Sequence, residues 1–417
     1  MSDYVTFSIG TGRLSTGIDM KITAPPEHIV SVLNQLTSEG HDSFLVGGSV
    51  RDAIMNRPVH DWDLATSATP VDVARLFPKT VLTGERFGTV TVVLPECSVE
   101  VTTFRTEGNY QDSRHPEEIT FVSNIREDLS RRDFTINAMA ESAEGELIDP
   151  FGGVEDIKNS IIKCVGGPNT RFSEDALRMF RALRFSAELG FSIEAETLQA
   201  IYAGAGAAKR ISTERIRLEL EKTLLSQRPE VAGEMIKIGL LDRYMGISGK
   251  SPGGLEKIAK LPKETTIRWC LFCAILLEKR YINSATELLH DLHLDGKKIK
   301  TVLRALLIKD FPDDRAGIKR LLSKNETNVV RCAAAVNDAF GKSNSLEFTE
   351  EILSSGECTT ISKLAVTGRD LIKMGHRAGP ELGETLQKLL EHVIENPQDN
   401  TREVLLKVGG LSEINTD

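Results

Sequence analysis

Two kinds of hydrophobic pattern divide the chain. From about residue 20 to residue 158, short alternating apolar runs are interleaved with helix-like segments, whereas beyond residue 158 nearly every apolar pattern has the period of a helix. The first pattern predicts a mixed β-sheet flanked by helices, and the second predicts helices alone. We therefore expect an α+β protein. Its expected divisions are a leader or disordered arm at 1–19, a head at 20–158, and three helical domains at 159–225, 226–310 and 311–417.

The head pattern predicts individual elements. SFLVGG, residues 43–48, is an apolar run that ends at a glycine pair, which is typical of a buried strand. PVDVARLF, residues 70–77, begins with proline, which the first turn of a helix tolerates well. GTVTVVLP and SVEVTTFR alternate between apolar and polar residues and predict the two strands of a hairpin, at 88–95 and 98–105. The same reasoning predicts helices at 26–40 and 49–57 and a strand at 62–67.

Composition narrows the class of protein. The 417 residues are 40% hydrophobic. No window approaches the roughly 18 consecutive apolar residues of a membrane span, and the N-terminus lacks a secretory signal, so we expect a cytoplasmic protein with no membrane partner. Cys270 and Cys273 lie in the apolar run IRWCLFCAILL, which favours helix core over a zinc site.

The charge of the chain bears on nucleic-acid binding. A net charge of −9 argues against such a partner, because phosphate contacts need lysine and arginine. A local basic face would remove this objection, and residues 256–310 carry more basic than acidic side chains. The alternative interpretation of that segment is an ordinary solvated helix surface.

Two aspartates in HDWDLATS carry the first chemical signal. Asp61 and Asp63 are two residues apart, so on a strand they would share one face while Trp62 points to the other. Neighbouring carboxylates repel each other unless a cation lies between them, and Mg²⁺ is the natural cation for oxygen ligands. Glu100, on a later predicted strand, is a candidate third acid. The alternative is a pair of solvated loop acids.

The segment LVGGSVRD, just before these acids, predicts an anion site. A strand, a glycine pair and a helix start would leave backbone N–H groups where Gly48 lets a ligand come close. Arg51, one turn further on, could add a positive charge, although an ordinary tight turn would also explain the glycines. Together with the acids, this corner predicts a site for a metal-bound nucleoside triphosphate.

Two further clusters favour nucleotide binding. RRDFTINAM places Arg132 among groups that can bind phosphate and ribose. SEDALRMFRALRF predicts a helix capped by Ser173, with charged residues at three-residue spacing: Asp175, Arg178, Arg181 and Arg184.

Asp175 and Arg178 would form a fork with one acceptor and one donor. Cytosine and adenine each offer an amino donor beside a ring-nitrogen acceptor, which matches this fork, whereas guanine and uracil do not. The alternative is a surface ion pair between the two residues, three apart on a helix.

These segments, taken as a set, resemble the class II tRNA nucleotidyltransferases, the CCA-adding enzymes, of bacterial type. The resemblance covers residues 22–226 and rests on LVGGSVRD, DWDLAT, RRDFTINAM and EDALRMFRALRF in that order. It implies a nucleotidyltransferase head followed by helical neck, body and tail domains. It also implies that Asp61 and Asp63 bind Mg²⁺, with Glu100 as a less secure third carboxylate. Contacts with the nucleotide are implied for Gly48, Arg51 and Arg132. Recognition of the base is implied for Asp175 and Arg178, and Arg181 and Arg184 would complete the site.

The resemblance implies a reaction and its partners. C, C and A are added to the tRNA 3′ end from CTP and ATP, with release of pyrophosphate and without a nucleic-acid template; no protein partner is implied. FRTEGNYQDSRHP, residues 104–116, resembles the flexible loop that the family needs for the final A. The helical remainder is expected to hold the acceptor arm and elbow of tRNA, with Lys297, Lys298 and Lys300 as candidate phosphate contacts.

Several alternatives share these residues. A bacterial poly(A) polymerase has the same catalytic segments but is usually more basic, and this chain ends in the acidic LSEINTD. An enzyme that adds only the terminal A is a nearer alternative. An RNA-binding protein on an inactive scaffold is disfavoured, because Asp61 and Asp63 are intact. A metal phosphohydrolase of the His-Asp type is also disfavoured, because the His-Asp pairs that begin at His41 and His290 lack the companion metal ligands.

Overall fold

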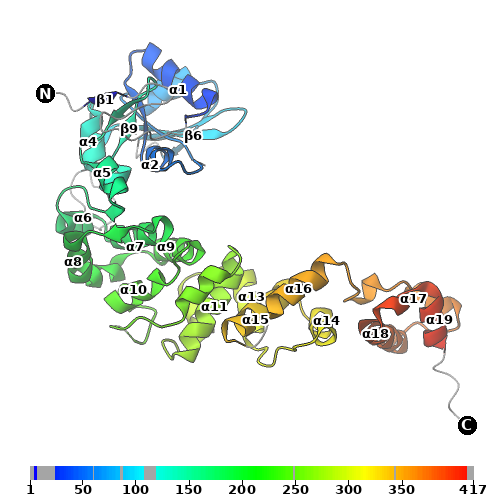
Figure 1. Cartoon of the computed structure of the whole chain (residues 1–417). Helices are drawn as coiled ribbons and strands as arrows, with labels where there is room; N and C mark the ends of the chain where they lie inside the picture. The colour runs from blue at the N-terminus through cyan, green and yellow to red at the C-terminus, as the bar shows by residue number, and fades with distance from the viewer. Residues whose placement is uncertain are drawn as a thin grey trace, which may run out of the picture. The chain divides into compact units, whose positions relative to one another are not determined.

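The computed structural model of the chain describes residues 4–6, 24–59, 61–84, 88–107, 119–247, 249–341 and 344–410. They form two compact units. The first comprises Met1–Thr223, Val231–Arg243 and Ser248–Ser251, and the second comprises Leu224–Glu230, Tyr244–Ile247 and Pro252–Asp417. A sheet with helices forms the N-terminal part and helices form almost all of the rest, which confirms the α+β class (Figure 1). The predicted divisions near residues 158 and 310 stay predictions.

The sheet of the head is mixed, as predicted. Its strand order is β1-β10-β9-β2-β3-β6-β5-β4, and β3 and β6 pair in parallel whereas the other neighbours are antiparallel. The predicted hairpin is present as β5 and β6. The strands are β1 (Tyr4–Thr6), β2 (Ser43–Val46), β3 (Asp63–Thr66), β4 (Thr80–Gly84), β5 (Thr89–Val93), β6 (Ser98–Thr103), β9 (Ala140–Glu141) and β10 (Glu146–Ile148).

Two results at the sheet differ from the sequence prediction. Residues 4–6, expected in a leader or disordered arm, pair with β10 along its full length, so the prediction is wrong for these residues. Strands β4, β9 and β10 were not predicted, because they are edge or very short strands with little apolar alternation.

Helices cover the sheet because alternate strand residues point to opposite faces. On one face, Leu45 and Leu64 pack in a core with α1 (Glu27–Ser38), α2 (Gly48–Ile54) and α3 (Pro70–Leu76). On the other, Val46 and Ala65 pack in a core with Leu129 of α4 (Ile125–Ser130). The three helices on the first face are those that the sequence predicts. A small sheet of β7 (Arg105–Glu107) and β8 (Ile119–Phe121) precedes α4, and residues 108–116 of the predicted flexible loop lie outside the described residues.

The rest of the first unit is mainly helical. Its further elements are η2 (Thr135–Asn137), α5 (Gly153–Lys158), β11 (Ile161–Ile162), α6 (Pro168–Glu174), α7 (Leu177–Leu189), β12 (Ser192–Ile193), α8 (Ala195–Gly204), η3 (Ala205–Arg210), α9 (Thr213–Leu225) and α10 (Val231–Ile238).

One prediction in this region is wrong. The expected helix capped by Ser173 is interrupted, because Ser173 lies inside α6 and Asp175 has extended backbone angles of −140° and 105°. The next helix, α7, starts at Leu177. The main-chain N–H of Leu177 donates to the carboxylate of Asp175 at 3.0 Å.

The second unit contains helices throughout its described part. Its elements are η4 (Leu255–Lys260), α11 (Thr265–Glu278), α12 (Ala285–Asp291), α13 (Gly296–Leu306), α14 (Arg315–Lys324), α15 (Thr327–Ala339), α16 (Ser345–Ser354), η5 (Ile361–Lys363), α17 (Gly368–Lys373), α18 (Pro380–Glu395), η6 (Pro397–Asp399) and α19 (Arg402–Gly410). Cys270 and Cys273 are fully buried in α11, which confirms their interpretation as helix core. No helix in the described part of the chain is both long and apolar enough to cross a membrane.

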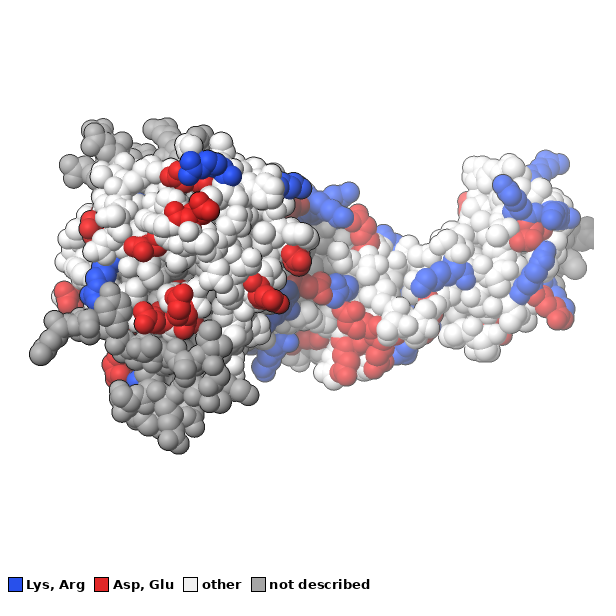
Figure 2. Space-filling model, turned by 90° about the horizontal axis from the view of Figure 1, so that it is seen from above, with Lys and Arg blue, Asp and Glu red and all other residues white. Residues whose placement is uncertain are grey.

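The surface charge of this unit is mixed. Figure 2 shows both basic and acidic side chains on one face of the molecule. On α13, Lys298 pairs with Asp295 at 3.7 Å and Lys300 with Glu326 at 3.8 Å. The role of these α13 lysines in phosphate binding stays a prediction.

A buried arginine in the first turn of α11 binds main-chain carbonyls within the second unit. Arg268 is only 2% exposed, and its guanidinium donates to four main-chain carbonyls, those of Leu224, Ser226, Leu261 and Pro262, at 2.6–3.1 Å. Burial lowers the pKa of Arg268. The four carbonyl oxygens therefore stabilise the buried positive charge of Arg268.

Replacing Arg268 with alanine should lower the free energy of unfolding by at least about 3 kcal/mol, because each buried carbonyl that loses its donor costs roughly 1–3 kcal/mol. Urea unfolding followed by the fluorescence of buried Trp269, in a Trp62→Phe background, measures this loss. The control is Arg228→Ala, at an exposed side chain paired with Glu230, which should change the stability little. A loss in Arg268→Ala no larger than in the control would contradict the assignment.

Candidate active site

One cavity in the first unit gathers every side chain that the sequence predicts for the site. Its volume is about 780 Å³, and it lies between the sheet of the head and helices α7 and α9. Its lining includes Gly48, Arg51, Asp61, Asp63, Glu100, Arg132, Asp175, Arg178, Arg181 and Arg184.

The acids lie on or next to two parallel strands that pair side by side. Asp63 is the first residue of β3, and Glu100 is directly opposite it on β6. Asp61 precedes the strand, so the prediction that it shares a strand face with Asp63 is wrong, although both residues line the cavity. Trp62 packs against the apolar core of the head.

The electrostatics of the acids favour a cation. Burial and the charges of Glu100 and Asp61 raise the pKa of Asp63 to about 6, and only the positive charge of Arg132 opposes this shift. Within the described ranges, no group of three acidic, histidine or cysteine side chains forms a complete metal-ligand cluster. A divalent ion such as Mg²⁺ often takes one or two carboxylates and completes its shell with water and phosphate oxygens. The acids fit such a partial set of ligands.

The glycine pair allows an arginine to approach the backbone closely. Gly47 has a φ of 75°, and a Cβ atom there would lie 2.9 Å from Nη1 of Arg132. No side chain caps the start of α2 at Gly47. Arg51, in contrast, is held by the protein: it donates to both oxygens of Asp52 at 2.9–3.0 Å and to Oδ1 of Asn137 at 2.6 Å. Its predicted contact with the nucleotide stays a prediction.

Two arginines of α7 are also fixed by carboxylates. Arg181 donates to Asp133 at 2.6–2.7 Å. Burial would raise the pKa of Asp133, but the charge and hydrogen bond of Arg181 and the hydrogen bond of Asn137 lower it to about 2. Arg184 is buried and pairs with Glu219 and Glu188 at 2.5–2.6 Å. Both arginines therefore form a rigid part of the cavity wall.

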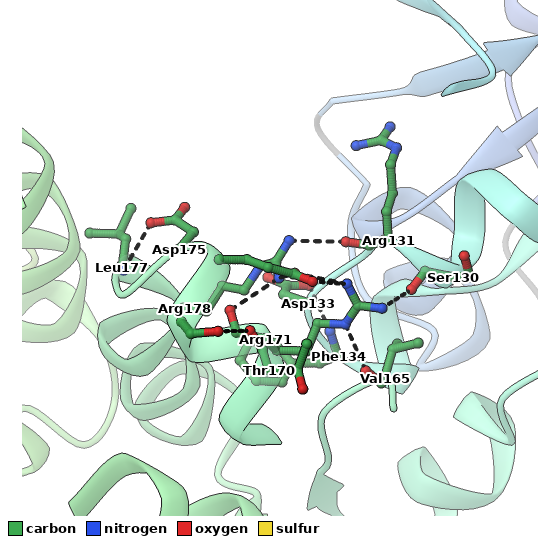
Figure 3. A network of polar contacts seen from close by, with 12 residues as sticks. Ser130, Arg131, Asp133, Phe134, Val165, Thr170, Arg171, Asp175, Leu177 and Arg178 are labelled. Atoms are coloured by element: carbon green, nitrogen blue, oxygen red, sulfur yellow. Dashed lines mark hydrogen bonds and ion pairs between the residues drawn. The ribbon is translucent and has the colours of Figure 1, made fainter. Parts of the chain in front are cut away.

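The predicted base-recognition pair has different partners from those expected. Asp175 accepts two hydrogen bonds from Arg215 of α9, at 2.7 and 3.3 Å. Arg178 pairs with Glu174 at 2.5 Å and donates to the main-chain oxygen of Arg131 at 3.0 Å (Figure 3). The alternative of an ion pair between Asp175 and Arg178 is not tested by these contacts. Asp175 lies before the start of α7 and Arg178 lies in its first turn, and both line the cavity.

Several lining residues were not predicted. Sequence reasoning saw only a helix in STERIRLELEKTLLS and missed Arg215 and Lys222, although both are polar residues in a helix with a buried face. It also missed Arg105, because neither its strand nor its spacing distinguishes it from surface residues. Arg131 also lines the cavity and was not among the predicted site residues.

Comparison with known proteins identifies the family. Residues 43–163 match the family model of the Poly A polymerase head domain, and residues 260–408 match that of domain 2 of tRNA nucleotidyltransferases. The CCA-adding enzyme of Geobacillus sp. is 39% identical, with 91% of this chain and 95% of that protein covered. The CCA-adding enzyme of Enterococcus faecalis is 36% identical, with 93% and 97% covered. The chain belongs to the CCA-adding enzyme family.

Solved structures of the family have the same fold. The CCA-adding enzyme of Bacillus stearothermophilus, crystallised with CTP, is 33% identical with a TM-score of 0.72, over 93% of this chain and 97% of that one. The Thermotoga maritima CCA-adding enzyme, complexed with tRNA, is 21% identical with a TM-score of 0.65, over 92% and 95%, and supports the fold alone. CCA-adding enzymes are nucleotidyltransferases that use divalent metal ions, so this chain is one as well.

The raised pKa of Asp63 predicts a pH-dependent metal affinity. Below pH about 6 the carboxyl group is protonated, and a proton must leave before the oxygen can bind a cation. The affinity for Mn²⁺, measured by electron paramagnetic resonance, should fall up to about tenfold per pH unit below pH 6 and level off above pH 7. The Asp63→Asn variant should bind more weakly and lose this dependence. A wild-type affinity that is constant between pH 5 and 7 would contradict the prediction.

Proposed function

We propose that this chain is a CCA-adding tRNA nucleotidyltransferase. It adds C, C and A to the 3′ end of tRNA from CTP and ATP, releases pyrophosphate, needs no nucleic-acid template and depends on Mg²⁺. The observation that carries the proposal is the single cavity that joins the acids of β3 and β6, Arg132 and the pair Asp175 and Arg178.

The cavity offers a separate place for each part of the nucleotide. Its volume of about 780 Å³ is sufficient for a nucleoside triphosphate. The glycine corner and Arg132 would hold the triphosphate, since backbone N–H groups and a guanidinium both favour phosphate oxygens. Asp61 and Asp63 lie beside this corner, so the reacting phosphate would be near the acids.

Base selection follows from the opposite character of Asp175 and Arg178. The carboxylate can accept from the amino group of cytosine or adenine, and the guanidinium can donate to the adjacent ring nitrogen. Arg215 holds Asp175 in place through two hydrogen bonds. Uracil or guanine would present a carbonyl to Asp175, and this mismatch costs roughly 1–3 kcal/mol.

The transfer needs positioning more than covalent chemistry by the protein. When bound, Mg²⁺ would lower the pKa of the tRNA 3′-hydroxyl and neutralise charge on the leaving pyrophosphate. Asp61 and Asp63 would hold this ion, with Glu100 as the adjacent third carboxylate. Arg132 would hold the triphosphate so that the α-phosphate faces the hydroxyl. No step requires a covalent intermediate with the chain.

The alternatives predict different products. The match to a Poly A polymerase head domain reflects a head shared with that class, whereas the relatives with 36–39% identity over most of the chain are CCA-adding enzymes. An enzyme specific for the terminal A would extend only tRNA that already ends in CC. The role of residues 104–116 in adding the final A stays a prediction.

Product length decides between these activities. The assay combines purified protein with tRNA that lacks CCA and with each nucleotide alone or in pairs. We expect three added residues, and only when CTP and ATP are both present.

Asp63→Asn should lower the rate by at least about a thousandfold, because one of the two predicted metal ligands loses its charge. Asp42→Asn, at an exposed carboxylate outside the cavity, is the matched control. A long A ladder, A addition alone, or near-normal turnover by Asp63→Asn would each overturn the proposal.

Substitution of Arg178 tests base recognition. Arg178→Ala should reduce discrimination against UTP and GTP by roughly tenfold to a hundredfold, because the donor of the fork is lost. Single-nucleotide incorporation at matched concentrations measures the ratio, with Arg210→Ala, at an exposed residue of η3, as the control. Unchanged discrimination in a folded Arg178→Ala variant would remove Arg178 from this role.

A further inference from the structure

Asp128, near the end of α4, is a fully buried carboxylate outside the set of predicted site residues. Its Oδ1 accepts from Nε and Nη2 of Arg131, at 3.0 and 2.8 Å, and from the main-chain N–H of Arg105 at 3.3 Å. Its Oδ2 accepts from Nη2 of Arg132 at 3.1 Å. The side chain has 0% exposure, and the two arginines are 17% and 18% exposed. One carboxylate thus holds two cations that line the nucleotide cavity.

The contact with Arg132 has a direct consequence for the phosphate end of the cavity. While Nη2 is bound to Asp128, Nη1 lies beside the glycine corner, 2.9 Å from the place of a Cβ at Gly47. The charge of Arg132 also lowers the pKa of Asp63. The position of Nη1 beside Gly47 therefore depends on the carboxylate that holds Nη2.

The contact with Arg131 reaches the base end. Nε of Arg131 also donates to the main-chain oxygen of Arg105 at 3.1 Å, so its side chain is fixed on two sides. Its own main-chain oxygen accepts from Nη2 of Arg178 at 3.0 Å, and the oxygen of Ser130 accepts from Arg171 at 2.6 Å (Figure 3). The turn after α4 is therefore attached to Asp128 on one side and to the arginines of α6 and α7 on the other.

Asp128 is held in its ionised form by the two arginines that it contacts. Burial alone would raise the pKa of Asp128, but the charges of Arg131 and Arg132 and the hydrogen bonds from Arg131 and Arg105 lower it. Asp128 is thus ionised at neutral pH. Charge-assisted hydrogen bonds are shorter and stronger than neutral ones, and removal of the Asp128 charge leaves two partly buried guanidinium groups without this carboxylate partner.

We propose that Asp128 is a positioning residue for nucleotide binding: it fixes Arg132 at the triphosphate end and, through the main chain at Arg131, Arg178 at the base end. This inference rests on the proposed function. It assigns a role to a residue that does not touch the nucleotide and acts only through the arginines.

The test is a comparison of Asp128→Asn with Glu127→Gln. Both changes replace a carboxylate by its amide on the same helix, but Glu127 is exposed. For Asp128→Asn we expect the KM for CTP and ATP to rise at least about tenfold and the discrimination against UTP and GTP to fall several-fold. Glu127→Gln should stay within about twofold of the wild-type chain, since it removes an exposed charge.

A double variant shows whether Asp128 acts through Arg132. If it does, Asp128→Asn in an Arg132→Ala background should raise the KM by much less than it does in the wild-type background, because the group that it positions is already absent. Circular dichroism and thermal melting establish that the variants fold. Where Asp128→Asn does not fold, Asp128→Glu keeps the charge but displaces it by one methylene, and the same rise in KM and loss of discrimination is expected.

The outcomes separate this inference from the proposed function. If the wild-type chain transfers neither C nor A to tRNA, the proposed function fails. If the wild-type chain is active and a folded Asp128 variant keeps the wild-type KM and base discrimination, only the role of Asp128 is overturned. A lower kcat with unchanged KM and unchanged discrimination, or effects that add fully to those of Arg132→Ala, would also overturn it, because these are the results of a purely structural residue.

Discussion

The parallel pairing of β3 with β6 places Asp63 and Glu100 side by side on neighbouring strands, with Asp61 just before Asp63 in the chain. Burial and the negative charges of Glu100 and Asp61 disfavour ionisation, and together they raise the pKa of Asp63. A cation that binds here would therefore relieve repulsion that the fold itself has created. The other features of the cavity can be understood as ways to bring positive charge to these acids without filling the place of the ligand.

The protein supplies that positive charge on arginines whose positions are fixed in advance. Each of these guanidinium groups has a carboxylate partner, so little side-chain freedom remains to be lost when a nucleotide binds. The same pairs lower the cost of placing several cations in a partly buried site. The pairs are Arg51 with Asp52, Arg132 with Asp128, Arg178 with Glu174, Arg181 with Asp133 and Arg184 with Glu219.

Local sequence was enough to predict some parts of this arrangement and not others. Apolar and polar residues alternate along 88–105, and a glycine pair follows the apolar run at 43–46. These local patterns were enough to predict the hairpin, the glycine pair at the start of α2 and the neighbouring acids. The contacts of Asp175 could not be predicted in this way, because its partner Arg215 lies 40 residues further along the chain. The role of Asp128 likewise depends on Arg105, 23 residues earlier, and on burial, and neither is visible in residue spacing.

The most direct measurement of the central claim is a crystal structure of the chain with CTP and Mn²⁺, in which the anomalous signal locates the ion. The account predicts the ion at Asp61 and Asp63, the triphosphate between Gly47 and Arg132, and the cytosine edge at Asp175 and Arg178. An ion bound elsewhere, or a base that contacts neither Asp175 nor Arg178 while the triphosphate occupies the cavity, would contradict it.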